Sequence, residues 1–131
     1  MNAPALTDLS RLCVHTITTK GWELEEAVER YAESGVSGIT VWRQWLEGRD
    51  PLEAGDRIRA AGLKVVSLCR GGFYPAFEEK DREEAIEDNK RAIEDAAALG
   101  APLVVLVCGA VPGQSLVESR KQITDGIAAT L

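Results

Sequence analysis

Arg59-Ala-Ala-Gly62 is followed closely by Lys64-Val-Val-Ser-Leu68, and this succession of a polar Ala-rich segment, a glycine and a β-branched run decides the fold class. The same succession occurs at Tyr31-Ala-Glu-Ser-Gly35 before Gly38-Ile-Thr-Val-Trp42, and at Ala96-Ala-Ala-Leu-Gly100 before Leu103-Val-Val-Leu-Val107. Glycine at these positions suits the left-handed residue that ends a helix. The pattern therefore predicts helices that alternate with strands, and so a parallel sheet.

The starts of the helices are marked by capping patterns. Asp50-Pro51-Leu52-Glu53 places an N-cap, a proline at the first helical position and a capping-box glutamate in order. Asp81-Arg-Glu-Glu84 and Ser115-Leu-Val-Glu118 repeat the spacing from cap to glutamate. We therefore predict strands at 11–15, 38–42, 64–68 and 103–107, and helices at 22–34, 51–61, 82–99 and 116–131.

The length of 131 residues allows one domain but excludes a complete eight-fold βα barrel, which takes about 250 residues. Four βα units can form a small doubly wound domain or half of a barrel. A doubly wound sheet often ends with a fifth strand or a long crossover, whereas 123–131 is still helical in period at the last residue. We therefore predict an α/β fold in which 1–131 form four parallel βα units, the N-terminal half of a (βα)8 TIM barrel truncated within the fourth helix.

Composition excludes several classes of protein. The 15 Lys and Arg residues are dispersed and outnumbered by 21 Asp and Glu, which argues against nucleic acid as a partner. No signal-peptide pattern opens the chain, and glycines and prolines interrupt its uncharged stretch at 96–117, so we expect no membrane span. Cys13, Cys69 and Cys108 have no CxxC spacing, which favours buried thiols, a reducing cytoplasmic location, and neither disulfides nor zinc.

In parallel βα architectures the catalytic and ligand-binding residues lie at the carboxyl ends of the strands. In this sequence none of the four strand ends carries Asp or Glu, so these ends alone cannot supply paired carboxylates or an oxygen-rich metal site. The four ends read His15-Thr16, Trp42-Arg43-Gln44, Cys69-Arg70-Gly71-Gly72-Phe73 and Cys108-Gly109-Ala110.

Two of these strand-end residues are candidate ligand-binding groups. His15, the only histidine, is either a hydrogen-bonded packing residue or a group that faces the mouth of the barrel, the opening at the carboxyl ends of the strands. Arg70 precedes two glycines that allow a close turn; its fork of donors could hold a carboxylate, phosphate or hydroxyl, or form a structural salt bridge. Aromatic residues near the same mouth either stack on a sugar or anchor loops, namely Trp42, Trp45, Phe73, Tyr74 and Phe77.

Ser67-Leu-Cys-Arg-Gly-Gly-Phe73, together with Gly21–Ala27 and Gly38–Arg43, resembles the sugar phosphate isomerase/epimerase family with the xylose-isomerase-like TIM barrel. The resemblance runs from Leu12 to Leu131 and covers the first half of the family's usual length. It implies an isomerase or epimerase of a ketose, aldose or related polyol. In such enzymes Mn²⁺, Mg²⁺ or Co²⁺ polarises the carbonyl while two glutamates move the proton.

The resemblance also says which site residues to expect. The family's metal ligands and glutamates lie on the fifth to eighth strands, so we expect no metal and no catalytic residue here, and an inactive fragment. Only substrate-facing positions carry over, namely His15, Trp42 and Arg70. The related endonucleases place metal-binding histidines after the second or third strand, where this chain has Arg43 and Arg70, so we reject a nuclease.

The main alternative is a non-catalytic half barrel that binds a small polyol or a partner. Its exposed sheet edges and apolar inner face would favour self-association. A third and weaker hypothesis is a thiol enzyme in which Cys69 or Cys108 pairs with His15 as nucleophile and base.

Overall fold

The computed structural model describes residues 3–131 and contains one parallel sheet with strand order β1-β2-β3-β4. The strands are β1 (Cys13–His15), β2 (Gly38–Trp42), β3 (Lys64–Gly72) and β4 (Val104–Val107). The helices are α1 (Leu24–Glu33), α2 (Pro51–Ala60), α3 (Glu79–Leu99) and α4 (Leu116–Thr130), and two 3-10 turns span Thr16–Thr19 and Arg43–Leu46. The predicted order of four βα units is confirmed.

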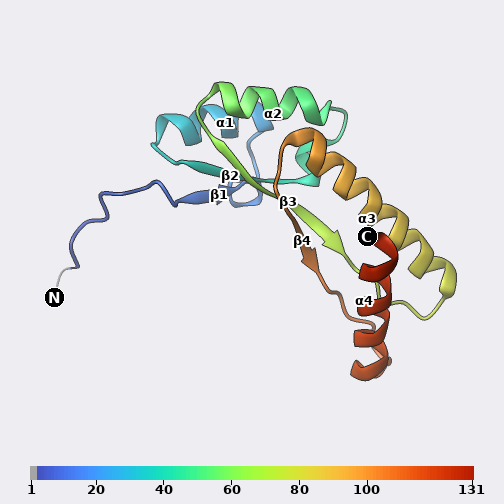
Figure 1. Ribbon diagram of the computed structural model, residues 1–131. Coiled ribbons are helices and arrows are strands. Elements are labelled where there is room, and N and C mark those ends of the chain that lie inside the picture. Colours follow the sequence, from blue (N-terminus) through green and yellow to red (C-terminus); the bar gives the residue numbers. More distant parts are fainter. Residues whose placement is uncertain (1–2) are drawn as a thin grey trace.

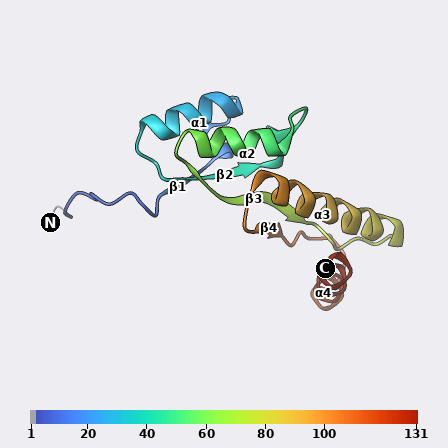
Figure 2. The ribbon, with the colours of Figure 1, turned by 45° about the horizontal axis from the view of Figure 1, so that its top comes forward.

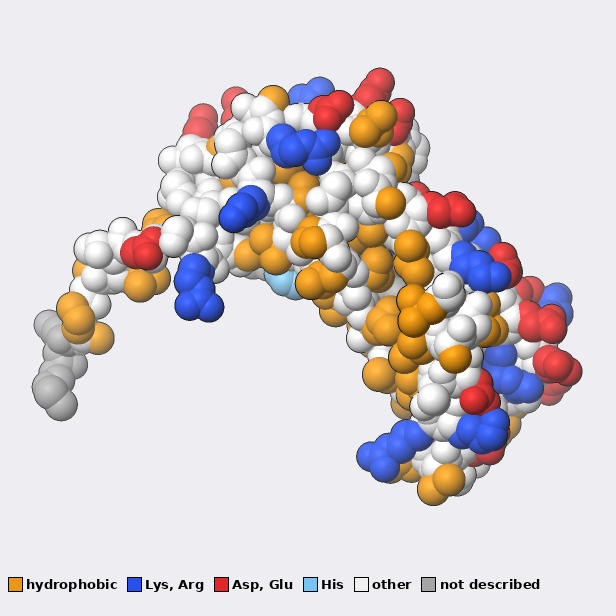
Figure 3. Space-filling model, in the orientation of Figure 1, with side chains coloured by type: hydrophobic (Ala, Val, Ile, Leu, Met, Phe, Trp, Pro, Cys, Tyr) orange, Lys and Arg blue, Asp and Glu red, His pale blue; other side chains and the backbone are white. Residues whose placement is uncertain are grey.

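Helices α1, α2 and α3 lie on the same side of the sheet, and α4 follows at the β4 end (Figures 1 and 2). A doubly wound domain would carry helices on both faces of its sheet, whereas a barrel keeps all of them outside. The molecule is arched, and hydrophobic side chains gather along the inner side of the arch (Figure 3). The fold is therefore half of a TIM barrel, with the inner face of its sheet open.

The hydrophobic core lies between the sheet and these helices. Ile39 and Val41 of β2 are fully buried there and pack with Leu24, Ile58 and other apolar side chains of the helices. Because side chains alternate along a strand, the neighbours of Ile39 and Val41 face the open side of the sheet. This alternation places Trp42 on the open face.

Capping side chains begin two of the helices as predicted. Asp50 accepts a hydrogen bond from the Leu52 amide at 2.8 Å, and Ser115 accepts one from the Glu118 amide at 3.1 Å. The predicted start of α3 was wrong, because the helix begins at Glu79, ahead of the Asp81 capping pattern. Arg82 instead donates hydrogen bonds to carbonyl oxygens of the preceding loop and so fixes the chain as it enters the helix.

The third strand is longer than predicted, since β3 continues to Gly72 rather than ending at residue 68. Gly71 and Gly72 pair with Leu106 and Val107 of β4, where a Cβ on Gly72 would clash with the Val107 carbonyl. The two glycines thus extend the sheet, and the backbone takes positive φ angles where the strand ends, at Gly72 (100°) and Phe73 (54°).

The expectation of buried thiols was wrong for one cysteine. Cys69 is buried and Cys13 is half-buried, but Cys108 is exposed because it follows β4, the last strand of the sheet in the part of the chain described. All three are free thiols. Within residues 3–131 no helix combines the length and the apolar character that crossing a membrane requires.

Candidate functional site

Two of the predicted site residues are hydrogen-bonded to each other across neighbouring strands. The indole Nε1 of Trp42 donates to Nδ1 of His15 at 3.1 Å. Both side chains are half-buried at the carboxyl ends of β1 and β2. His15 shares the open face with Trp42, because Val14 between Cys13 and His15 packs toward the core. Both residues were predicted from the sequence, whereas the bond between them was not.

The main chain around this pair is held by two further hydroxyl groups. Thr16, which is fully buried, accepts a hydrogen bond from the Trp42 amide at 3.0 Å. The hydroxyl of Tyr31, on α1, donates to the carbonyl oxygen of His15 at 3.2 Å. The ends of β1 and β2 are therefore linked through both main chain and side chains, which limits the orientations that the imidazole and indole rings can take.

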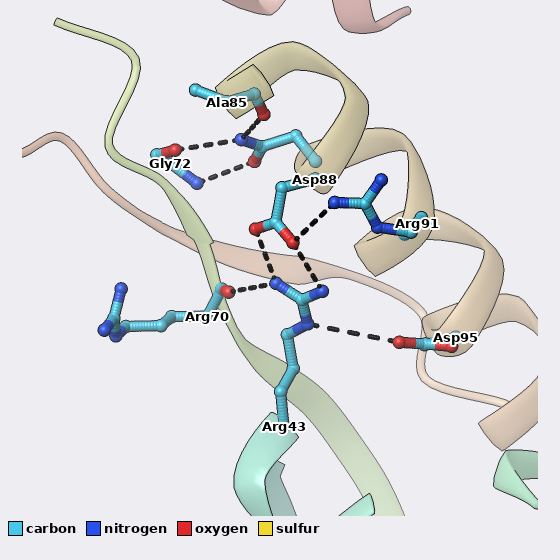
Figure 4. Close-up of polar contacts among 8 residues, drawn as sticks. Arg43, Arg70, Gly72, Ala85, Asp88, Arg91 and Asp95 are labelled. Carbon is cyan, nitrogen blue, oxygen red and sulfur yellow. Dashed lines mark hydrogen bonds and ion pairs between the residues drawn. The ribbon is translucent and has the colours of Figure 1, made fainter. Parts of the chain in front are cut away.

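Arg70 lies on β3 at an irregularity of the sheet, where the pairing with β4 shifts between Cys69 and Gly71. Its side chain is directed away from α3 (Figure 4), and its guanidinium carbon lies 4.1 Å from the centre of the Phe73 ring. Among residues 3–131, no carboxylate forms a salt bridge with it. The alternative of a structural salt bridge for Arg70 is therefore not what the structure shows.

Arg43 forms the structural ion pair instead (Figure 4). Its guanidinium donates to both carboxylate oxygens of Asp88 on α3, at 2.8 and 3.0 Å, and lies 4.0 Å from Asp95. The hydrogen bonds with Arg43 lower the pKa of Asp88, and the same bonds raise the pKa of Arg43. A longer contact of 3.5 Å reaches the carbonyl oxygen of Arg70, so this pair also supports the main chain that carries the Arg70 side chain.

An open groove of about 560 Å³ lies between the segment that follows β2 and helix α3. Its lining includes Arg43, Glu47, Arg70 and Asp88, but neither His15 nor Trp42. The structure therefore joins His15 and Trp42 directly and places Arg70 on β3, the strand next to that of Trp42, without enclosing all three in one cavity.

The aromatic residues divide into two groups. Trp45 donates from Nε1 to the Trp22 carbonyl at 2.8 Å, and buried Tyr74 bonds Thr130 of α4 at 3.0 Å, so both anchor structure. Phe73 and Phe77 are exposed, and the Phe73 ring forms a cation–π contact with the Arg70 guanidinium. Of the five aromatic candidates, Trp42 is the one whose polar atom bonds another predicted site residue.

The residues present do not fit a divalent metal. Within residues 3–131 no three His, Cys, Asp or Glu side chains lie close enough together to hold an ion. The thiol hypothesis is also weakened, because burial raises the pKa of Cys69, whereas a nucleophilic thiolate needs a lowered one. What the strand ends offer is hydrogen-bond donors and an aromatic ring.

These features define a class of protein: half of a TIM barrel, with hydrogen-bonding side chains near the carboxyl ends of its strands. Residues 28–131 match the family model for the xylose isomerase-like TIM barrel, and the chain belongs to that family. A comparison with curated protein sequences gave no match.

Solved structures share the fold of this chain. Protein SMc04130 from Sinorhizobium meliloti 1021 is 40% identical, with a TM-score of 0.85 over 95% of this chain and 46% of that one. A xylose isomerase domain containing protein from Salmonella typhimurium LT2 is 16% identical, with a TM-score of 0.69 over 98% and 49% of the two chains. The 3-keto-D-glucoside 4-epimerase YcjR from E. coli is 22% identical, with a TM-score of 0.63 over 81% and 44%. The chain thus spans about half the length of each of these three solved structures.

Proposed function

We propose that this chain is the substrate-binding N-terminal half of a sugar isomerase or epimerase that acts on a ketose, an aldose or a related polyol. The observation that carries the proposal is the Trp42 to His15 hydrogen bond on the open face of the sheet, in a chain of the xylose isomerase-like family. The name of the similar E. coli protein, an epimerase of a ketoglucoside, supports the choice of reaction.

The three predicted residues take different roles in this proposal. The indole N–H of Trp42 is occupied by His15, so its ring offers an apolar surface on which the C–H face of a sugar can lie. His15 and Arg70 donate hydrogen bonds to substrate oxygens and so fix the orientation of the ligand. Because Arg70 has no carboxylate partner among residues 3–131, its donors are available.

The reaction itself needs groups that these residues do not contain. We propose that four further βα units complete the barrel and carry the carboxylates that move the proton, together with Mn²⁺, Mg²⁺ or Co²⁺. The metal would polarise the substrate carbonyl. No step at that metal is assigned to the residues described, because they do not fit one. A cytoplasmic location belongs to the same proposal, and the three free thiols support it.

The test uses the natural protein that contains these 131 residues. A panel of aldoses and ketoses is incubated with the protein and Mn²⁺, and interconversion is followed by NMR spectroscopy. We expect one ketose and its partner sugar to interconvert, and chelation of the metal to stop the reaction. A folded protein that converts no sugar in the panel, with any of the three metals, would contradict the proposal.

The exposed edges of the sheet favour one second candidate, a non-catalytic module that self-associates. The outer strands β1 and β4 are flanked by exposed apolar side chains, namely Leu12, Leu103, Leu106 and Val107. Such edges can pair with another chain. Sedimentation of the 131-residue chain should then show a stable dimer, and that dimer should bind xylitol without metal. A monomer that does not bind xylitol would exclude this candidate.

A further inference from the structure

We propose that the open face of the sheet, at the carboxyl ends of β1 to β3, binds an anionic group of the substrate, either a carboxylate or a phosphate. This inference rests on the proposed function and adds to it the charge of the ligand. Two observations support it. His15 and Arg70 can donate hydrogen bonds at this end of the sheet, and the Arg70 cation has no anionic partner among residues 3–131.

The first donor is His15, whose tautomer the structure assigns. An indole N–H can only donate, so the Nδ1 atom of His15 that receives it from Trp42 must be an acceptor. The proton of the neutral imidazole therefore lies on Nε2, and within residues 3–131 Nε2 has no hydrogen-bond partner. His15 thus presents an N–H group to a ligand and has no acceptor left to offer.

The second donor is Arg70, a half-buried residue whose guanidinium lies over the ring of Phe73. Partial burial of a cation without an opposite charge is unfavourable, and a bound anion would relieve it. The neighbouring thiol of Cys69 cannot serve as that anion, since burial raises its pKa and keeps it neutral.

Three carboxylates line the groove that also includes Arg70, namely Glu47, Asp88 and Asp95, and none of them forms an ion pair with Arg70. Asp88 and Asp95 belong to α3, on the opposite side of β3 from the Arg70 side chain, and both pair with Arg43 (Figure 4). None of the four strand ends carries Asp or Glu. Since none of the carboxylates that line the groove pairs with Arg70, a ligand can supply the opposite charge, and a group rich in acceptors suits two donors better than a set of hydroxyls does.

The test titrates the 131-residue chain with inorganic phosphate, acetate and xylitol at constant ionic strength, by calorimetry. We expect phosphate or acetate to bind more tightly than xylitol, and the stronger of the two identifies the anion. Arg70→Met should weaken that binding about tenfold to a hundredfold. The matched control Arg120→Met removes the same charge from an exposed position on α4 and should leave the affinity unchanged. Arg70→Lys keeps the charge and should retain part of the affinity.

A second measurement reads the tautomer directly, because the chain has a single histidine. Nitrogen-15 spectra should show the imidazole proton on Nε2, Trp42→Phe should mix the two tautomers, and the bound anion should shift Nε2. Anions that bind no better to the wild type than to Arg70→Met, or a proton on Nδ1, would overturn the inference. If xylitol shifts His15 and the anions do not, the inference fails while the proposed function stands. If nothing shifts His15, both fail.

Discussion

The side-chain amide of Asn89 bonds both main-chain groups of Gly72. The Gly72 N–H donates to Oδ1 of Asn89 at 2.6 Å, and Nδ2 of Asn89 donates to the Gly72 carbonyl oxygen at 2.9 Å. Asn89 is buried in α3, one residue after Asp88, which binds Arg43. Two successive residues of α3 therefore support the end of β3: Asn89 binds Gly72 directly, and Asp88 acts through Arg43, which contacts the Arg70 carbonyl oxygen at 3.5 Å.

Replacing Asn89 with Ala should destabilise the protein, because it leaves a buried amide and a buried carbonyl of Gly72 without partners. We expect the free energy of unfolding in urea to fall by about 2–3 kcal/mol. Glu83→Ala, at an exposed position of the same helix, serves as the control and should change it by less than about 0.5 kcal/mol. Equal effects of the two substitutions would show that Asn89 does not hold the strand.

The ion pair between Arg43 and Asp88 should make stability depend on pH. The hydrogen bonds with Arg43 lower the pKa of Asp88 from its ordinary value of 3.8, so the carboxylate favours the folded state above pH 3.8. That contribution is lost as the pH falls below this value. Because the Asp88 side chain is 45% exposed, we expect at most about 1 kcal/mol.

The measurement compares the unfolding free energies of the wild type and Asp88→Asn between pH 7 and pH 3. The difference between them should stay constant at neutral pH and shrink toward pH 3. Glu83→Gln, the control, should differ from the wild type by the same small amount throughout. A difference between wild type and Asp88→Asn that persists unchanged at pH 3 would rule out this role for the pair.

Helices α2 and α3 meet at Gly55, where an added Cβ would clash with the carbonyl oxygen of Leu99. Since that carbonyl is main chain at the end of α3, the contact is relieved only if the helices move apart. Gly55→Ala should therefore lower the melting midpoint and cost about 1–3 kcal/mol of stability. Gly21→Ala has no atom within 4 Å of the new methyl and should be close to neutral. If Gly55→Ala is as stable as Gly21→Ala, the helices are not packed this closely.

The three thiols should react with iodoacetamide at very different rates. Cys108 is exposed and should be alkylated first, whereas burial both shields Cys69 and raises the pKa of its thiol. Peptide mass mapping after brief treatment checks this order. An isomerase activity that survives modification of Cys108 would leave no role for that thiol in the reaction, while rapid labelling of Cys69 would contradict the burial described.

Local signals in the sequence were sufficient for most of the fold. Glycine at the helix ends and the capping residues Asp50 and Ser115 set boundaries that the structure confirms to within two residues. The strand β3 was underestimated because Gly71 and Gly72 are typical of turns. Their pairing with β4 depends on residues more than thirty positions away, and a local pattern does not contain that information.

The supporting residues of the site were harder to predict than its candidates. His15 and Trp42 are the last residues of their strands, and Arg70 lies two residues before the end of β3; topology alone identifies this edge of the sheet. Arg43 and Asp88 are 45 residues apart, and nothing in their local sequence pairs them. Asn89 did offer a signal, since asparagine is unfavourable inside a helix and a buried one needs side-chain partners.

The most direct test of the account measures solvent deuterium entering the carbon next to the carbonyl of the substrate sugar. The natural protein containing these residues is incubated with Mn²⁺ in deuterated water, alongside its Arg70→Met and Arg120→Met variants. We predict that the wild type and Arg120→Met catalyse the exchange, and that Arg70→Met lowers kcat/KM about tenfold to a hundredfold. An absence of exchange in the folded wild type, or equal rates in all three proteins, would contradict the account.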